Sequence, residues 1–146
     1  HTRSYAVTGV QTCALPIWAR LEGITKEYGV GIAVGEQTQA LCPDIVFREL
    51  DKVRVKGKAT AVSIHQPLCL ANELDEELRA ELASWQAALE AYRQQQWREA
   101  ARILEHLLQK KPDEALYRLY RERVAHLLLA PPGDGQWDGV TNFKTK

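Results

Sequence analysis

The stretch Lys52–Ile64, KVRVKGKATAVSI, carries the clearest two-residue periodicity in the chain. Apolar side chains at every second position, with basic side chains between them, predict a strand that has one buried and one charged face. The buried face would hold Val53 and Val55, and the charged, solvated face Lys52, Arg54 and Lys56. Gly57 supplies a turn, and Val62 and Ile64 alternate on a returning strand. The stretch therefore predicts a β-hairpin.

The residues before this hairpin predict two helices and another strand. Apolar residues at helical spacing over residues 20–28 predict an amphipathic helix, which Gly29 ends. In Val30–Val34, apolar residues alternate with small ones, which predicts a short strand. Glu36–Leu41 fits a brief helix that Pro43 stops.

From Asn72 onward the apolar spacing becomes helical. A long amphipathic helix is predicted from residues at steps of three and four, and Asn72, with Asp75 three residues on, offers its N-terminal cap. Its apolar positions are Leu74, Leu78, Leu82, Trp85, Leu89 and Tyr92. A second apolar stripe over Ala100–Leu108 predicts another helix, which ends near Lys110, Lys111 and Pro112.

A third helix is predicted to begin after Asp113, whose carboxylate can cap it. Its apolar positions are Leu116, Tyr120, Val124 and Leu127. After Ala130 the sequence is rich in Pro and Gly, which predicts an extended tail over residues 131–146.

The spacing of small and large residues across the first two of these helices resembles that of a tetratricopeptide repeat (TPR). The matching positions are Ala88, Trp97, Ala100, Leu104 and Pro112. In that repeat, alanines let two antiparallel helices approach closely. We therefore expect an antiparallel helix pair with Trp85, Tyr92 and Trp97 in its core.

The composition is that of a globular protein. The chain has 146 residues, of which 45% are hydrophobic and 26% are charged. The 19 basic and 19 acidic residues balance, so net charge indicates no nucleic-acid or anionic-membrane partner. Cys13, Cys42 and Cys69 lack the spacing of a disulfide framework or a zinc site. His65, His106 and His126 stand apart from one another, which favours packing or surface roles.

The chain contains no Met and begins at His1, which predicts that it is part of a longer protein. Residues 1–18 show neither helical nor strand periodicity, and their GVQTCALPI segment resembles translated sequencing-adapter sequence. These residues are therefore expected to be foreign to the protein. The alternative is a genuine irregular N-terminal segment.

Three motifs in order carry a resemblance to a known family. Residues 19–23 read A-R-L-E-G, residues 28–29 read Y-G and residues 55–58 read V-K-G-K. This series resembles the C-terminal half of the catalytic domain of class III adenylate and guanylate cyclases. The closing P-P-x-x-x-x-W-D-G-V of residues 131–140 is similar to the C-terminus of bacterial membrane-anchored adenylate cyclases with an extracytoplasmic sensor.

The resemblance implies an α+β fold in consecutive parts. Residues 19–69 would be the closing portion of a ferredoxin-like cyclase domain, without its leading strands and so with an exposed sheet edge. Residues 70–130 would form an α-helical TPR-like hairpin with one further helix, and residues 131–146 the tail.

The resemblance also implies a reaction, the conversion of ATP to cyclic AMP and pyrophosphate. Arg20 matches the arginine that stabilises charge in the transition state, a task that suits a planar guanidinium. Lys56 matches the lysine that holds the triphosphate, and Lys58 is the second candidate. Without the resemblance, Arg20 would be read as a surface residue of a helix. The family expects Asn four residues before this arginine, where the chain has Pro16.

The remaining expectations concern cofactors, partners and location. The Mg²⁺ or Mn²⁺ ions of the intact enzyme would bind carboxylates upstream of this chain, so the chain by itself is expected to be inactive. The intact protein is expected to be a cytoplasmic-facing homodimer anchored in the bacterial inner membrane. An alternative function is a helical protein-interaction module without catalysis, in which the extension binds a protein partner. Nucleic-acid binding is disfavoured because no aromatic residues are interleaved with the basic strand face.

Overall fold

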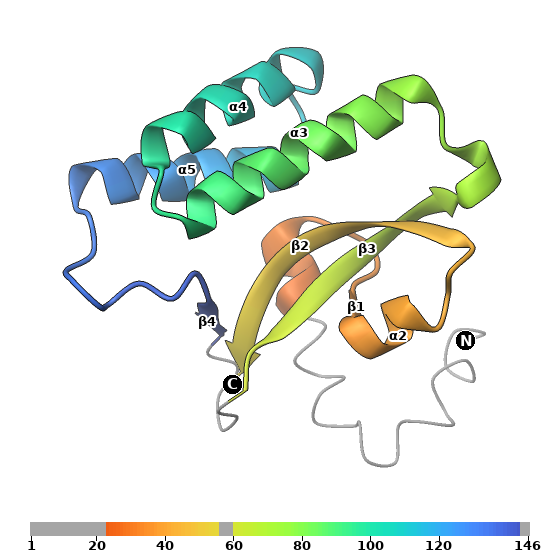
Figure 1. Cartoon of the computed structure of the whole chain (residues 1–146), viewed down its shortest axis with the longest axis horizontal. Coiled ribbons are helices and arrows are strands. Elements are labelled where there is room, and N and C mark those ends of the chain that lie inside the picture. Colours follow the sequence, from red (N-terminus) through yellow and green to blue (C-terminus); the bar gives the residue numbers. More distant parts are fainter. Residues whose placement is uncertain (1–22, 56–59, 144–146) are drawn as a thin grey trace.

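The computed structural model describes residues 23–55 and 60–143, and it confirms a mixed α+β architecture. In this part of the chain a four-stranded sheet lies beside a layer of three long helices (Figure 1). Residues 23–28 are helical. The elements that follow are β1 (Val34–Gly35), α2 (Glu36–Ala40), β2 (Ile45–Val55), β3 (Val62–Leu70), a 3₁₀ turn (Ala71–Glu73), α3 (Glu76–Arg93), α4 (Trp97–Lys110), α5 (Ala115–Leu129) and β4 (Thr141–Phe143).

The predicted hairpin is confirmed as antiparallel β2 and β3, the two longest strands of the sheet. The strand order is β1-β3-β2-β4, with β1 antiparallel to β3 and β4 parallel to β2. Lys52 is exposed and Val53 is buried, as the alternation predicts. The predicted turn at Gly57 and the side chain of Val55 lie outside the described residues.

A β-bulge in β2 changes which side chains face the helices. Glu49 pairs with His65 and Asp51 with Ile64, so Leu50 is an extra residue in β2. An extra residue moves the following side chains to the other face of the strand. Leu50 and Asp51 are therefore both fully buried, although they are consecutive.

The helix before Gly29 ends as predicted, but the strand after it is shorter than predicted. The amide of Gly29 donates to the carbonyl of Lys26 and that of Val30 to the carbonyl of Thr25, the two bonds of a Schellman motif. Of the predicted strand Val30–Val34, only Val34 pairs with β3, together with Gly35 after it. Beyond these two residues, no described strand pairs with the outer edge of β3.

The long helices match the predicted periodicity, with corrections at their ends. Asp75 itself caps α3 by accepting a hydrogen bond from the amide of Leu78 at 2.8 Å, whereas Asn72 lies in the preceding 3₁₀ turn. The predicted capping by Asp113 is wrong. Glu114 precedes α5 without a side-chain cap, and Asp113 pairs with Arg118 at 3.1 Å.

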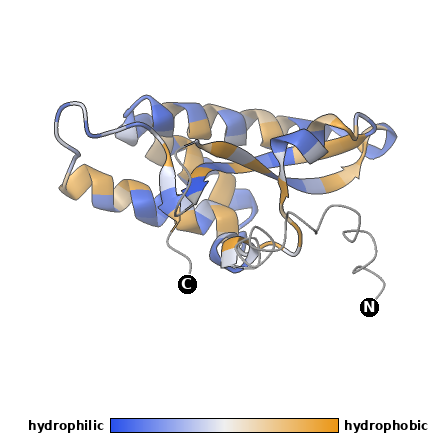
Figure 2. Ribbon diagram, turned by 90° about the horizontal axis from the view of Figure 1, so that it is seen from below, coloured by the Kyte–Doolittle hydropathy of each residue, from blue (hydrophilic) through white to orange (hydrophobic). Residues whose placement is uncertain are grey.

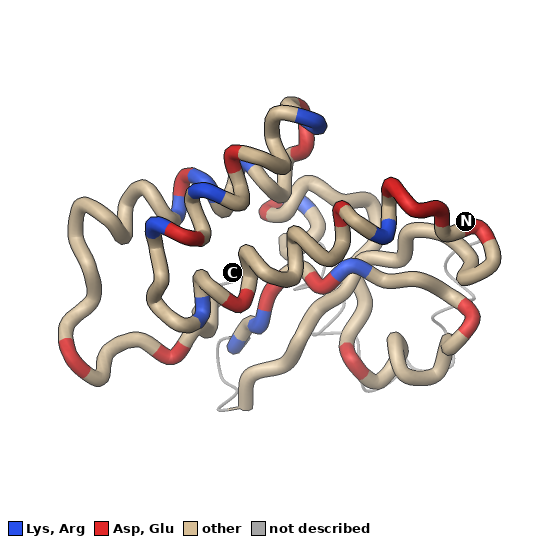
Figure 3. The backbone as a smooth tube through the Cα atoms, turned by 45° about the horizontal axis from the view of Figure 1, so that its top comes forward, with Lys and Arg blue, Asp and Glu red and all other residues tan. Residues whose placement is uncertain are grey.

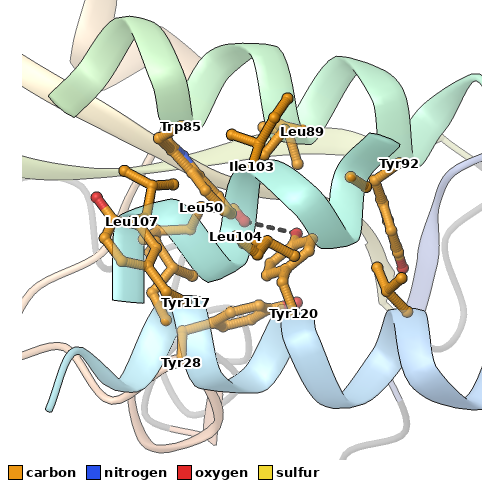
Figure 4. Packing of buried hydrophobic residues seen from close by; sticks show 14 of the residues in the cluster. Tyr28, Leu50, Trp85, Leu89, Tyr92, Ile103, Leu104, Leu107, Tyr117 and Tyr120 are labelled. Atoms are coloured by element: carbon orange, nitrogen blue, oxygen red, sulfur yellow. Dashed lines mark hydrogen bonds between the residues drawn. The ribbon is translucent and has the colours of Figure 1, made fainter. Parts of the chain in front are cut away.

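One core joins the sheet to the helices. Hydrophobic and hydrophilic residues alternate along the helices (Figure 2), and the buried apolar residues form a single cluster drawn from the helical segment 23–28, the sheet and α3–α5. Figure 4 shows Trp85 and Tyr120 meeting in this cluster, where their ring centroids are 4.9 Å apart. Trp85, Tyr92 and Trp97 are buried, as predicted. The predicted segments 19–69 and 70–130 therefore share an interior.

The tail is not simply extended. Trp137 packs edge-on against Tyr92 and Trp97, and its indole nitrogen donates to the carbonyl of Arg93 at 2.9 Å. The chain then forms β4 beside β2, with Val53 opposite Thr141. The tail consequently completes the sheet. None of the described helices is both long and apolar enough to cross a membrane.

Candidate functional site

The three residues that the sequence assigns to chemistry, Arg20, Lys56 and Lys58, lie outside the described residues. Their roles stay predictions. In sequence, Arg20 comes three residues before the helical segment 23–28, and Lys56 follows the last residue of β2.

The most concentrated polar network of the described residues surrounds Asp51, whose side chain is fully buried. One oxygen, Oδ2, accepts hydrogen bonds from the hydroxyl of Tyr28, from Arg123 Nη1 at 2.8 Å and from Thr141 Oγ1 at 2.6 Å. The other, Oδ1, accepts from the amide of Lys52 at 2.7 Å. Asp51 thus joins the segment 23–28, β2, α5 and β4. We call these four side chains, Tyr28, Asp51, Arg123 and Thr141, the Asp51 cluster.

Aromatic rings enclose the charge pair at the centre of this cluster. The guanidinium of Arg123 lies 5.4 Å from the ring centroid of Tyr28 and 4.9 Å from that of Tyr120. Burial, and then the negative charge of Asp51, raises the pKa of Tyr28 well above its ordinary value. The Tyr28 hydroxyl therefore keeps its proton and donates a hydrogen bond to the carboxylate.

A second cluster lies farther along the same contact between β2 and α5, and we call its residues, Arg48, Gln66, Glu81, Glu114 and Tyr117, the Arg48 cluster. Arg48 donates to the hydroxyl of Tyr117 at 3.1 Å, to Gln66 Oε1 at 2.6 Å and to Glu114 Oε2 at 3.1 Å. Tyr117 in turn donates to Glu81 of α3 at 2.6 Å. Burial, and then this hydrogen bond, raises the pKa of Tyr117 well above its ordinary value. Arg48 is thus held by groups from β3 and α5.

The hydrogen-bonded residues of β2 and those of α5 follow one another in the same order along the two elements. Glu114, just before α5, and Tyr117, Tyr120 and Arg123 of α5 follow one another at steps of three residues, so they form a stripe that turns around the helix by about 60° per step. Along β2 their partners are Arg48 for the first two, the carbonyl of Leu50 at 2.7 Å for Tyr120, and Asp51 for Arg123. A shift of α5 along β2 would separate Arg123 from Asp51 and Glu114 from Arg48, so these two pairs favour the observed register of helix and strand.

A hollow of about 400 Å³ opens beside the Asp51 cluster. Its lining includes the charged residues Glu27, Glu122 and Arg123, together with His126 and Trp137. Figure 3 likewise shows acidic and basic residues interspersed along the helices. Arg123, the basic residue of this lining with a permanent charge, is already paired with Asp51.

The described residues hold no cluster of three or more His, Cys, Asp or Glu side chains that could bind a metal ion. The carboxylates that the resemblance implies for Mg²⁺ or Mn²⁺ were predicted to lie upstream of the chain, and this stays a prediction.

The comparisons with known proteins give one partial match. The chain is 39% identical over 49 residues to adenylate cyclase 1 of Rhizobium meliloti (strain 1021), and the overlap covers 33% of this chain. It covers only 7% of that protein. No family model and no solved structure matches the chain. The match supports a relationship to cyclases over about a third of the chain.

Sequence reasoning missed the Asp51 cluster and the Arg48 cluster. It placed Arg54 on the solvated face of its strand, where the side chain is partly exposed, but it did not foresee the bonds to Asn142 at 2.8 Å and to Asp138 at 3.2 Å in the tail. One feature of the sequence could have indicated these clusters. Arg48 and Asp51 are three residues apart in one strand, and two residues at that spacing face the same side only where a bulge adds a residue.

Proposed function

We propose that the chain is part of a class III adenylate cyclase, an enzyme that converts ATP to cyclic AMP and pyrophosphate. The partial match to a cyclase carries this proposal. The three motifs around Arg20, Tyr28 and Lys56 support it. The order of the described elements between them supports it as well: a helix, a short strand, a short helix and then the hairpin. In this proposal the sheet is the closing part of a ferredoxin-like domain, and α3 with α4 is the TPR-like hairpin.

In the proposed enzyme, Arg20 stabilises the charge that develops on the transferring phosphoryl group, and Lys56 or Lys58 holds the triphosphate. Two divalent metal ions, Mg²⁺ or Mn²⁺, would supply Lewis-acid activation when bound. Their ligands belong to residues upstream of the chain. The enzyme would act as a homodimer that faces the cytoplasm from a membrane anchor elsewhere in the protein.

A chimera tests the proposal. Residues 19–146 replace the corresponding C-terminal portion of an intact class III adenylate cyclase, and Mg²⁺- or Mn²⁺-dependent formation of cyclic AMP is measured. We expect activity in the chimera and none in the chain alone. Activity in the chain alone would refute the prediction that the upstream residues are required. A folded, dimeric chimera without activity would refute the proposed function.

Charge removal in the same chimera tests the assigned residues. Arg20→Ala and Lys56→Ala should each lower kcat/KM by about 100-fold or more, the usual scale for loss of one transition-state donor. The matched controls are Lys26→Ala in the segment 23–28 and Lys52→Ala in β2, both exposed lysines. The controls should leave kcat/KM within about twofold of the unchanged chimera. An equal effect of Lys52→Ala and Lys56→Ala would remove the assigned role of Lys56.

A further inference from the structure

The helical extension is fastened to the sheet through polar contacts as well as apolar ones. Glu114, just before α5, and Tyr117, Tyr120 and Arg123 of α5 all bond to β2, and Trp85 of α3 donates to the carbonyl of Glu49 at 2.7 Å. These faces of α3 and α5 are therefore occupied within the chain. This arrangement favours a role for the extension inside the enzyme.

The Asp51 cluster connects the two segments that lead to the assigned residues. Tyr28 ends the helical segment whose sequence continues backward to Arg20, and Asp51 lies in the strand whose sequence continues forward to Lys56. Through its Oδ2 atom, Asp51 accepts from Tyr28 and from Arg123 of α5. Within the Asp51 cluster, the Tyr28 hydroxyl ties the helical segment to the strand.

We propose that Asp51 and Arg123 are positioning residues of the cyclase, an inference that rests on the proposed function. The helical extension, through Arg123, holds the Asp51 carboxylate in place. Asp51 in turn holds Tyr28, and so sets the helix leading to Arg20 against the strand leading to Lys56. The extension would thus be required for productive geometry at the phosphates, without contacting the nucleotide.

Electrostatics explains why Arg123 is essential to this arrangement. A fully buried carboxylate is stable only with a counter-charge or several hydrogen-bond donors. Arg123 supplies the positive charge, and its planar fork reaches both Asp51 and, at 3.3 Å, the Tyr28 oxygen. A lysine keeps the charge but lacks the planar fork whose two nitrogens contact Asp51 and Tyr28 separately, so it should loosen Tyr28 while leaving the carboxylate neutralised.

The test uses Tyr28→Phe and Arg123→Lys in the active chimera, each measured for kcat and for KM of ATP. Tyr117→Phe is the matched control for the first, because that tyrosine is equally buried and its hydroxyl bonds only within the Arg48 cluster. Arg121→Lys, at an exposed arginine on α5, is the control for the second. Circular dichroism at the assay temperature establishes that each variant is folded.

We expect Tyr28→Phe and Arg123→Lys to lower kcat by about 10-fold or more with KM changed less than about threefold, because small misplacements of reacting groups reduce turnover strongly. Tyr117→Phe and Arg121→Lys should keep kcat within about twofold. The proposal is overturned if Tyr28→Phe affects kcat no more than Tyr117→Phe, or if only KM changes. An inactive native chimera would instead refute the proposed function.

Hydrogen exchange in the chain itself tests the physical coupling without any activity. Arg123→Lys should speed amide exchange in both 24–28 and 51–55 by about 10-fold or more, whereas Arg121→Lys should change neither region. If exchange in 24–28 stays as in the unchanged chain while Arg123→Lys is folded, Arg123 does not hold that helix and the inference falls.

Discussion

Gly29 is constrained at its position in two independent ways. Its φ of 68° lies in the left-handed region, which residues with a Cβ rarely adopt. A Cβ placed there would also lie 2.5 Å from the Cβ of Ala115, the first residue of α5. The same glycine therefore ends the helical segment 23–28 and permits the close approach of α5.

Replacing Gly29 by Ala should destabilise the chain by about 2 kcal/mol or more, from the left-handed φ and the overlap with Ala115 together. The measurement is urea unfolding followed by circular dichroism. Gly31→Ala is the control, because nothing lies within 4 Å of a Cβ built there. It should change the free energy of unfolding by less than about 1 kcal/mol. Similar costs at the two positions would contradict the packing role of Gly29.

His65 predicts how stability depends on pH. It is half-buried against the edge of the Phe47 ring, and burial is the main cause of a pKa below its ordinary value of 6.5. Glu49 and Glu36 oppose this shift, and Arg93 adds to it. Because the folded chain favours the neutral imidazole, the stability from this residue is present above pH 6.5 and is lost as pH falls through the lowered pKa.

The free energy of unfolding should therefore fall between pH 7.5 and pH 5.5, and His65→Gln should make that fall smaller. Urea unfolding at the two pH values gives both differences. From pH 7.5 to pH 8.5 the His65 contribution stays constant, so the unchanged chain and His65→Gln should respond alike there. If the free energy of unfolding falls equally in both proteins between pH 7.5 and pH 5.5, His65 is not the source of the pH dependence.

At the scale of elements, β2 and α5 show which features sequence periodicity predicts and which it does not. Alternating valines predict the hairpin and apolar steps of three and four predict the helices, because both patterns report one buried face. The bulge at Leu50 breaks the alternation, so Asp51 reads as a surface residue. The apolar spacing placed Tyr120 on the buried side of the third helix, but it gave no sign that Glu114 and Arg123 pair with charges of β2, because buried matched charges look like exposed ones in a sequence.

The tail gives a prediction at the same scale. Trp137→Ala should destabilise the chain by about 2–4 kcal/mol, since the indole packs against Tyr92 and Trp97 and bonds to the carbonyl of Arg93. Asp134→Ala, at an exposed position in the same segment, is the control and should cost less than about 0.5 kcal/mol. Urea unfolding measures both. A cost below about 1 kcal/mol for Trp137→Ala would mean that the tail is not anchored by its indole.

At the scale of the whole molecule, the sequence predicts the class of the fold and not its assembly. The hairpin, the helices and the apolar core residues follow from local periodicity. The return of Thr141 to β2, the pairing of Arg54 with the tail and the Asp51 cluster depend on contacts between distant segments. No local pattern reports such contacts, and the assigned residues Arg20, Lys56 and Lys58 came from family resemblance alone.

The sequence separation within the Asp51 cluster has a consequence for synthesis in the cell. Arg123 follows Asp51 by 72 residues and Thr141 follows it by 90. At roughly 5–20 residues per second, the ribosome needs roughly 5–20 s to deliver those partners. During that interval the newly made hairpin carries an acid with no counter-charge and an uncovered apolar face, so the nascent chain is a natural client for chaperones until α5 and β4 have emerged.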